Sequence, residues 1–338
     1  MSIATHENTT GTAAIGAEFS ELTSGCGLID LSHRAKISLT GDDRTRWLNG
    51  MITNNIRDLA VGHGVYAFLL NPQGRILADL YAYNRGDSIM LDTDRSQTER
   101  LLATFDHYII MDDVEVQDAT AQTSAIGLAG PRATNVLRAA GLEGSSLEPL
   151  QFIGIKVGDI HATLIRGDFP ATEWFEIWTP PTDLDQLQNV LLNSGAKSVS
   201  HGALDLVRVA AGVPRYGQDI RERDLPQETE QARALNFNKG CYIGQEIVER
   251  IRSRGAVHRK FTGFDVEGAL PALGTKIQSD GKDAGEITSA AVLPLADGDR
   301  KVALGYIRRE VASPGRKLQA GDTMLSVSNL PFAGVFRH

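Results

Sequence analysis

Hydrophobic and polar residues follow two different rhythms along the first third of the chain, and each rhythm predicts a kind of secondary structure. In the segment 35–40, hydrophobic residues occupy every second position, which is typical of a half-buried strand. In the segment 42–51, Trp47, Leu48 and Met51 recur at the spacing of a helix face. The elements predicted for this region are strands over 35–40, 65–70, 76–83 and 87–91 and helices over 42–51 and 96–105, with Asn71-Pro72-Gln73-Gly74 as a turn between the second and third strands.

The same mixture of strand and helix patterns returns between residues 121 and 200. The predicted elements are strands over 124–128, within 153–165 and over 175–179, and helices over 131–140 and 183–193. We therefore predict two α+β modules, residues 26–120 and 121–200, followed by a return segment of helix and loop over 201–256. Residues 1–25 are rich in Thr, Ala and Gly and are predicted to form a flexible tail.

The last region, residues 257–338, has a different pattern. Short β-rich pieces alternate with glycines, and no long helical pattern occurs. The pieces lie at 261–266, 276–278, 286–291 and 302–307. This spacing predicts a small antiparallel sandwich or barrel.

The composition is that of an ordinary soluble protein. A chain of 338 residues with 42% hydrophobic and 22% charged residues can build its cores without disulfide or metal. Two cysteines cannot form a structural zinc site alone, and the eight histidines show no helical ligand spacing, so we expect no metal bound by this chain alone. The chain has no run of 18 apolar residues and no secretory signal, so we expect no membrane association and a cytoplasmic location. The formal net charge of −8 argues against direct binding of nucleic acid.

One short segment carries the strongest chemical signal. In Lys239-Gly240-Cys241-Tyr242-Ile243-Gly244-Gln245-Glu246, a thiol lies between glycines and close to a lysine. If a helix begins near Gln245, the helix N-terminus and Lys239 would both lower the pKa of Cys241. An isolated cysteine is more often a buried structural residue. The segment 249–254 also fits a strand, because its arginines alternate with Ile251 and Ser253.

This segment, followed by Arg250 and Arg254-Gly255, resembles the signature of the YgfZ family of folate-binding proteins, which includes a mitochondrial iron–sulfur assembly factor. From about residue 26 to residue 255 the chain also resembles the wider superfamily of the glycine-cleavage T-protein, an aminomethyltransferase. The segments that carry this second resemblance are Leu28-Ile29-Asp30-Leu31-Ser32-His33, Thr53-Asn54-Asn55, Gly74-Arg75-Ile76-Leu77-Ala78-Asp79-Leu80, Phe175-Glu176-Ile177, Leu206-Val207-Arg208 and Ala211-Gly212-Val213-Pro214.

The resemblance implies a T-protein-like α+β fold. Two mixed α/β modules, of which 26–120 is the first folate-binding one, and a C-terminal antiparallel β-barrel over 257–338 would surround a central folate cavity. The ligand would be tetrahydrofolate or a one-carbon derivative of it. Glu176 and Arg208 match T-protein residues that hold the pterin and the tail region of the folate.

The resemblance also bears on catalysis. T-proteins have an acidic pair at the positions of Ala78 and Asp79, and one of its carboxylates faces the folate nitrogen that receives the one-carbon unit. Neighbouring residues on a strand face opposite ways, so aminomethyl transfer would be lost if the working acid belongs at position 78. The glutamate that the family has two residues after Arg208 is replaced here by Ala210.

The residue types agree with a folate-sized ligand. A carboxylate such as Glu176 can accept two hydrogen bonds from a pterin, and aromatic side chains suit its flat ring. The aromatic candidates are Tyr66, Tyr81, Tyr83, Phe169 and Trp174. The anionic tail could be received by Arg208 or by a basic run of Arg250, Arg252, Arg254, Arg259 and Lys260, although such a run also fits a solvated charged face.

Two hypotheses follow. In the first, the protein binds tetrahydrofolate and supports the assembly or repair of iron–sulfur enzymes. Cys241 is then its functional thiol, Lys239 lowers the pKa of that thiol, and iron–sulfur enzymes or assembly proteins are its clients. The thiol would form a mixed disulfide or contact a client's cluster. In the second, the protein transfers an aminomethyl or methyl group to tetrahydrofolate, and Asp79 orients or deprotonates the reacting amine. Direct tRNA binding by the arginine run is a third idea, which the acidic net charge disfavours.

Overall fold

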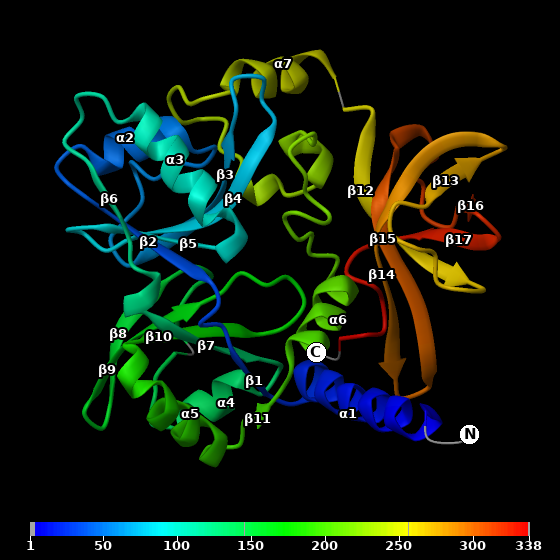
Figure 1. The fold of residues 1–338 in the computed structure, drawn as a ribbon, viewed down its shortest axis with the longest axis horizontal. Coiled ribbons are helices and arrows are strands. Elements are labelled where there is room, and N and C mark those ends of the chain that lie inside the picture. Colours follow the sequence, from blue (N-terminus) through cyan, green and yellow to red (C-terminus); the bar gives the residue numbers. More distant parts are fainter. Residues whose placement is uncertain (1–3, 145, 256, 337–338) are drawn as a thin grey trace.

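The computed structural model describes residues 4–144, 146–255 and 257–336. Two α/β modules lie on one side of the molecule and a β-barrel on the other, with the return segment between them (Figure 1). This arrangement confirms the T-protein-like α+β fold with a C-terminal barrel. Within the described residues, no helix has both the length and the apolar character needed to cross a bilayer.

The first module is a five-stranded antiparallel sheet with helices on one face. Its strands are β2 (Ala35–Thr40), β3 (His63–Leu70), β4 (Ile76–Asn84), β5 (Ile89–Thr93) and β6 (Glu115–Asp118), in the order β3-β4-β5-β2-β6. The helices are α2 (Arg44–Met51) and α3 (Thr98–Tyr108). The alternation along β4 fixes the site described below: Ala78 is fully buried in the core that α2 and α3 cover, whereas Asp79 lies on the opposite face.

The second module contains a six-stranded sheet in the order β11-β1-β7-β10-β9-β8. Its strands are β1 (Gly27–Asp30), β7 (Ser124–Ala129), β8 (Phe152–Val157), β9 (Ile160–Arg166), β10 (Trp174–Thr179) and β11 (Lys197–Ser198), with helices α4 (Ala133–Ala139) and α5 (Leu184–Asn193). The predicted start of the first module at residue 26 is wrong, because β1 pairs with β7 and β11 of this second sheet. A strand's own sequence does not tell which sheet it joins.

The N-terminal tail predicted for residues 1–25 is wrong over the part described. Residues Ala4–Ser24 form helix α1. Phe19 and Leu22, one turn apart, are fully buried in a core that also contains Val207 of the return segment and Leu293 of the barrel. This long-range packing stabilises the helix, and the local Thr/Ala/Gly composition gives no sign of it.

The return segment begins with helix α6 (His201–Ala211), which Ser200 caps by accepting a hydrogen bond from the amide of Ala203. The helix ends at Gly212 in the left-handed conformation (φ 70°). After a long loop with short 3-10 turns, the segment finishes in helix α7 (Gln245–Arg254). The helical alternative for residues 249–254 is therefore confirmed, and the strand alternative is wrong.

The C-terminal region is a closed antiparallel barrel in the order β12-β15-β14-β13-β16-β17. Its strands are β12 (Arg259–Glu267), β13 (Lys276–Ser279), β14 (Lys282–Leu295), β15 (Gly298–Arg308), β16 (Lys317–Ala320) and β17 (Thr323–Ser328). The barrel has its own hydrophobic core, which includes Phe264, Ile287 and Leu325.

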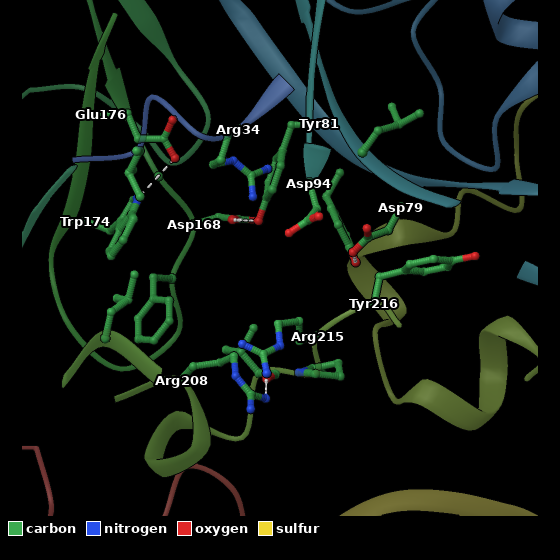
Figure 2. Close-up of a pocket in the computed structure, with 18 of the residues that line it drawn as sticks. Arg34, Asp79, Tyr81, Asp94, Asp168, Trp174, Glu176, Arg208, Arg215 and Tyr216 are labelled. Atoms are coloured by element: carbon green, nitrogen blue, oxygen red, sulfur yellow. Dashed lines mark hydrogen bonds between the residues drawn. The ribbon is translucent and has the colours of Figure 1, made fainter. Parts of the chain in front are cut away.

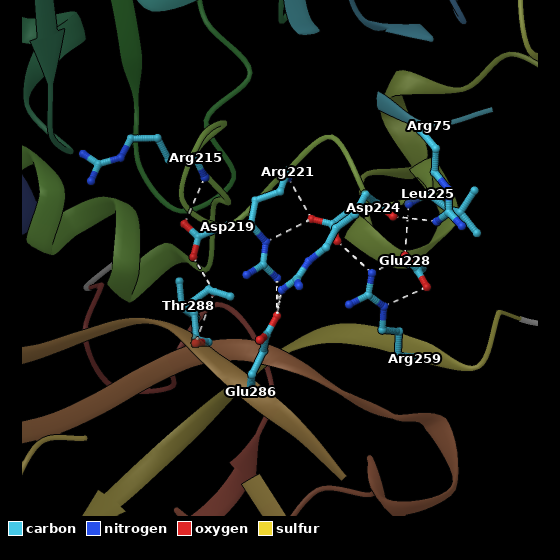
Figure 3. Close-up of polar contacts among 12 residues, drawn as sticks. Arg75, Arg215, Asp219, Arg221, Asp224, Leu225, Glu228, Arg259, Glu286 and Thr288 are labelled. Atoms are coloured by element: carbon cyan, nitrogen blue, oxygen red, sulfur yellow. Dashed lines mark hydrogen bonds and ion pairs between the residues drawn. The ribbon is translucent and has the colours of Figure 1, made fainter. Parts of the chain in front are cut away.

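Ion pairs join the return segment to the barrel (Figure 3). Arg259 of β12 donates to Asp224 (2.7 Å) and to both carboxylate oxygens of Glu228 (2.9 Å each). Glu286 of β14 accepts from Arg221 (2.5 Å). These contacts fix the barrel against the loop that leads to the central pocket.

Candidate functional site

A central pocket of about 300 Å³ opens where the two modules meet the return segment. Figure 2 shows Glu176 and Trp174 on one side, Asp79 on the other, and Arg208 and Arg215 below them. The structure brings eight predicted binding residues to this pocket: Tyr66, Asp79, Tyr81, Tyr83, Phe169, Trp174, Glu176 and Arg208. A volume of this size lies at the small end of the range for ligand sites.

Glu176 is held in the pocket wall by two indole groups. Alternation along β10 places Trp174, Glu176 and Trp178 on one face of the sheet. Trp174 Nε1 donates to one carboxylate oxygen (3.2 Å), and Trp178 Nε1 donates to the other (2.9 Å). Each oxygen has a second lone pair, so the carboxylate is fixed in orientation and can still accept two hydrogen bonds from a ligand.

Asp79 is fixed across the pocket from Glu176. One of its carboxylate oxygens accepts from the Tyr66 hydroxyl (2.7 Å) and the other from Gln97 Nε2 (2.7 Å). Burial raises the pKa of Tyr66, and the Asp79 charge raises it further, so this phenol stays a donor. The side chain of Gln97 also accepts from the Asp79 amide (2.8 Å). Asp79 therefore presents an oriented acceptor to the pocket.

Arg34 lines the same pocket and is held by a buried acid. Its Nε and Nη2 atoms donate to Asp92, at 2.6 Å for the shortest contact. Lys36, which is fully buried, donates to the other side of Asp92 (2.7 Å) and lies 4.6 Å from the centre of the Trp178 ring. Two cations thus share one carboxylate, and the pKa of Asp92 lies below its usual range because their attraction outweighs burial. Among the residues described, Arg34 Nη1 has no protein partner and remains accessible.

Arg208 is mostly engaged by the protein. Its Nε atom donates to Asp205 (2.7 Å), and its Nη1 atom donates to Asp219 (2.7 Å) and to the Val213 carbonyl (3.0 Å). Asp219 is completely buried. Arg215, whose side chain is about half exposed (48%), lies beside it and is the freer cation of the two.

An ion pair also lines the pocket. Arg233 pairs with Asp168, and Tyr81 donates to Asp168 (3.1 Å). The Arg233 guanidinium stacks on the Tyr66 ring, with 4.2 Å between the guanidinium carbon and the ring centre.

The structure places the motif cysteine elsewhere. Cys241 is exposed and is not among the residues that line the central pocket. Its loop is clamped against the β3–β4 hairpin: a Cβ at Gly244 (φ 79°) would lie 2.6 Å from the Asn71 carbonyl oxygen, and a Cβ at Gly74 would lie 2.8 Å from Ile247. Gly244 and Gly74 are therefore needed for this close packing.

Lys239 does not serve the thiol as predicted. Its Nζ atom is buried and donates to the carbonyl oxygens of Asn49 (2.5 Å), Ile52 (2.6 Å) and Asn54 (2.8 Å). Burial lowers the pKa of Lys239 to about 7, and a nearby arginine acts in the same direction, whereas the three carbonyl oxygens favour the ammonium form. The role of Lys239 is to fasten the motif loop to the first module, and the expectation that it activates Cys241 is corrected.

Of the other motif residues, Tyr242 is also structural. Tyr242 is buried in a cluster with Phe68 and Val248, Gly240 is exposed, and Gln245 and Glu246 form the first turn of α7. The basic run predicted as a tail receiver does not line the central pocket: Arg250 and Arg252 are exposed on α7, Arg259 pairs with Asp224 and Glu228, and Lys260 lies near Glu230. The side chain of Arg254 lies outside the described residues.

The pocket residues that were not predicted from the sequence include the polar side chains of Arg34, Gln97, Asp168, Arg215 and Arg233. Arg34 and Arg215 had a nearby signal, because each directly follows a segment that carries the T-protein resemblance, Leu28–His33 and Ala211–Pro214 respectively.

Comparisons with known proteins agree with this fold. Residues 5–239 match the GCVT N-terminal domain, and residues 255–333 match the CAF17 C-terminal β-barrel domain. An aminomethyltransferase from Rubrobacter xylanophilus is 29% identical over 302 residues, which cover 88% of this chain and 80% of that protein. One from Thermus thermophilus is 27% identical over 309 residues, covering 90% and 86%. The crystal structure of the glycine cleavage system aminomethyltransferase T from Bartonella henselae superposes with a TM-score of 0.85 at 25% identity, covering 95% of this chain and 90% of that one.

Proposed function

The chain belongs to the GCVT family and, with its CAF17-type barrel, to the YgfZ/CAF17 branch of the aminomethyltransferase superfamily; from this premise we propose that it binds a tetrahydrofolate derivative in the central pocket and supports iron–sulfur enzymes. The observation that carries the folate part is Glu176, a carboxylate fixed by two indole N–H groups in a pocket with aromatic walls. A relationship to aminomethyltransferases at 26–29% identity is compatible with the same ligand class.

The residues present fit the pterin end of a folate. The 2-amino and N3–H groups of a pterin are adjacent donors, and the Glu176 carboxylate has two free lone pairs to accept them. Trp174 stacks on Phe169, with 5.7 Å between ring centres, and forms a flat wall beside this carboxylate. Arg208 and Arg215 supply positive charge for the glutamate tail at the other end of the pocket.

We propose that Arg34 recognises the 4-oxo group of the pterin. This oxygen lies next to N3 on the ring, so a pterin bound to Glu176 turns the oxygen towards the neighbouring wall. The accessible Nη1 of Arg34 is a charged donor on that wall, and its other nitrogens are locked by Asp92. In this proposal Glu176 accepts hydrogen bonds from the two donors of the pterin, and Arg34 donates one to its 4-oxo group.

Aminomethyl transfer is the second candidate function, and the orientation of β4 favours it. Ala78 lies in the hydrophobic core of the first module, while Asp79 faces the pocket. The substitution at position 78 is thus on the face away from the ligand, and the acid that can reach a ligand is present. When bound, tetrahydrofolate would supply the acceptor nitrogen for a one-carbon unit, and Asp79 would orient or deprotonate the reacting amine.

The iron–sulfur role rests on the Cys241 segment and on the barrel of the CAF17 type. The thiol is exposed on a loop that Lys239, Gly244 and the β3–β4 hairpin hold in place. A fixed, accessible thiol can attack a client's disulfide, forming a mixed disulfide and releasing the client's other sulfur as a thiol, or it can contact the client's cluster. In this proposal the clients are iron–sulfur enzymes or assembly proteins.

Calorimetric titration with folinic acid tests the folate proposal. We expect saturable one-to-one binding to the wild type and a loss of at least tenfold in affinity in Glu176→Gln, because the amide has one acceptor oxygen and places a donor against an indole N–H. Glu173→Gln is the matched control, since Glu173 lies three residues earlier and contacts Arg166 and Thr134 rather than the pocket. Wild-type affinity in Glu176→Gln would reject the assigned pocket.

Two variants separate the candidate functions. If the protein maintains iron–sulfur enzymes, cells that carry Cys241→Ser should lose the activity of those enzymes while the purified variant still binds folinic acid. If it is a transferase, methylene-tetrahydrofolate formation should disappear in Asp79→Asn and persist in Cys241→Ser. Full iron–sulfur activity in cells with Cys241→Ser would reject the role of the thiol.

A further inference from the structure

A second cleft, separate from the central pocket, opens between the two modules. It has a volume of about 570 Å³ and lies between the start of the β4–β5 turn and one face of β8, β9 and β10. Its lining residues are Arg85, Gln122, Thr123, Gly154, Ile155, Lys156, His161, Ala162, Thr163, Trp178, Thr179 and Pro180. These include two permanent cations and one histidine and no carboxylate, although the whole chain has a net charge of −8.

The sheet register explains why basic and polar side chains gather there. Lys156 lies directly opposite His161, and Thr163 lies opposite both Gly154 and Trp178. Residues that are directly opposed in antiparallel strands share a face, so these five positions form one surface. Gly154 leaves this surface hollow, because a Cβ placed there would meet no atom within 4 Å.

Arg85 extends over this surface from the first module and lacks an acidic partner. Its guanidinium carbon lies 5.7 Å from the centre of the Trp178 ring, and its only side-chain hydrogen bond among the described residues is a long one to Thr163 Oγ1 (3.5 Å). Its Nε atom is buried without a partner, while Nη1 stays accessible. Burial lowers the pKa of Arg85, and the charge of nearby Asp87, which makes no ion pair with it, offsets this effect only in part. A buried cation without a directly paired carboxylate is costly, and an anion placed beside it would relieve that cost.

We propose that the cleft formed by Arg85, Lys156, His161, Thr163 and Trp178 binds the oxyanion group, phosphate or carboxylate, of a small ligand. Arg85 supplies a planar charged donor, Lys156 a second charge, and Thr163 a hydroxyl. Trp178 separates this cleft from the central pocket, since its Nε1 atom donates to Glu176 on the pocket side. The proposal does not depend on folate binding.

Calorimetric titration with sodium pyrophosphate and, separately, sodium citrate at constant ionic strength tests it. We expect saturable one-to-one binding of at least one anion, and the preferred anion identifies phosphate or carboxylate as the ligand group. Arg85→Met should weaken binding by about tenfold or more, the loss expected for a charge-assisted hydrogen bond. Gly154→Ile should also abolish it by filling the hollow. This change keeps both cations, and the residue is in an ordinary strand conformation.

Arg308→Met is the control, because Arg308 is an exposed barrel arginine far from this sheet in sequence and paired with Glu310. It should bind the anion like the wild type. An unchanged unfolding midpoint in Gly154→Ile shows that its loss of binding does not come from misfolding. The proposal is wrong if neither anion binds saturably at about 10 mM, or if both cleft variants bind like the wild type.

Discussion

Replacing Arg34 by methionine should change which pteridines the central pocket accepts. Arg34 donates to Asp92 through Nε and Nη2, and only Nη1 is available to a ligand. The substitution removes this donor and keeps most of the volume of the side chain. Asp92 retains Lys36 at 2.7 Å, so the buried acid is not left without a counter-charge and the protein should still fold.

The expected magnitude follows from that single donor. A hydrogen bond from a charged group contributes about 1.5–3 kcal/mol, so folinic acid, which has a 4-oxo group, should bind roughly 10- to 150-fold more weakly to Arg34→Met. Methotrexate has a 4-amino group at the same position, and in the wild type this group would place a donor against a donor. Its affinity should therefore stay the same or increase in Arg34→Met.

The measured quantity is the ratio of the two dissociation constants, determined by calorimetry for the wild type, Arg34→Met and the control Arg308→Met. Comparing ratios cancels general effects of the mutation on the pocket. We expect the preference for folinic acid to fall by about tenfold or more in Arg34→Met only. If the affinities for folinic acid and methotrexate fall by the same factor, Arg34 does not bind the 4-oxo group and the pterin is oriented differently.

Three further predictions concern stability and thiol chemistry. Asp219→Ala should lower the free energy of unfolding, measured in urea, by about 3–5 kcal/mol, because it leaves Arg208 without its buried partner. A decrease of less than about 1 kcal/mol would contradict this prediction. Iodoacetamide should label Cys241 in the native protein and Cys26 only after unfolding. The reason is that burial, together with two nearby glutamates, raises the pKa of the Cys26 thiol to about 12. Equal labelling rates of the two cysteines would contradict this prediction. Glu286 has a pKa below its usual 4.5 because its arginine partners outweigh burial, so its stabilising effect is present above that pH and is lost as the pH falls below it. The difference in melting temperature between the wild type and Glu286→Gln should accordingly shrink from about pH 6 to about pH 3, and a constant difference would argue against the ion pairs.

Local patterns predicted the elements and the orientation of the pocket side chains well. The alternation over residues 35–40 corresponds to β2 without any shift. Period-two alternation also implies that Ala78 and Asp79 face opposite ways, and the structure places Ala78 in a core and Asp79 in the pocket. The family resemblance then explains why Glu176 and Arg208, which belong to different parts of the chain, meet at one pocket.

The features that sequence reasoning missed are long-range. Lys239 was expected to act on its neighbour Cys241, yet its ammonium group bonds to carbonyls more than 180 residues earlier in the chain. Arg34 is held by Asp92, 58 residues away, and no local pattern indicates that pairing. Helix α1 was missed for the same reason, because its burial depends on α6 and the barrel.

The most direct test of the account is a crystal structure of the protein with folinic acid bound. It should show the 2-amino and N3–H groups of the pterin within about 3 Å of the Glu176 carboxylate oxygens, the 4-oxo group at Arg34 Nη1, and the glutamate tail near Arg208 and Arg215. A folate bound outside the central pocket, or a pterin edge turned away from Glu176, would contradict the account.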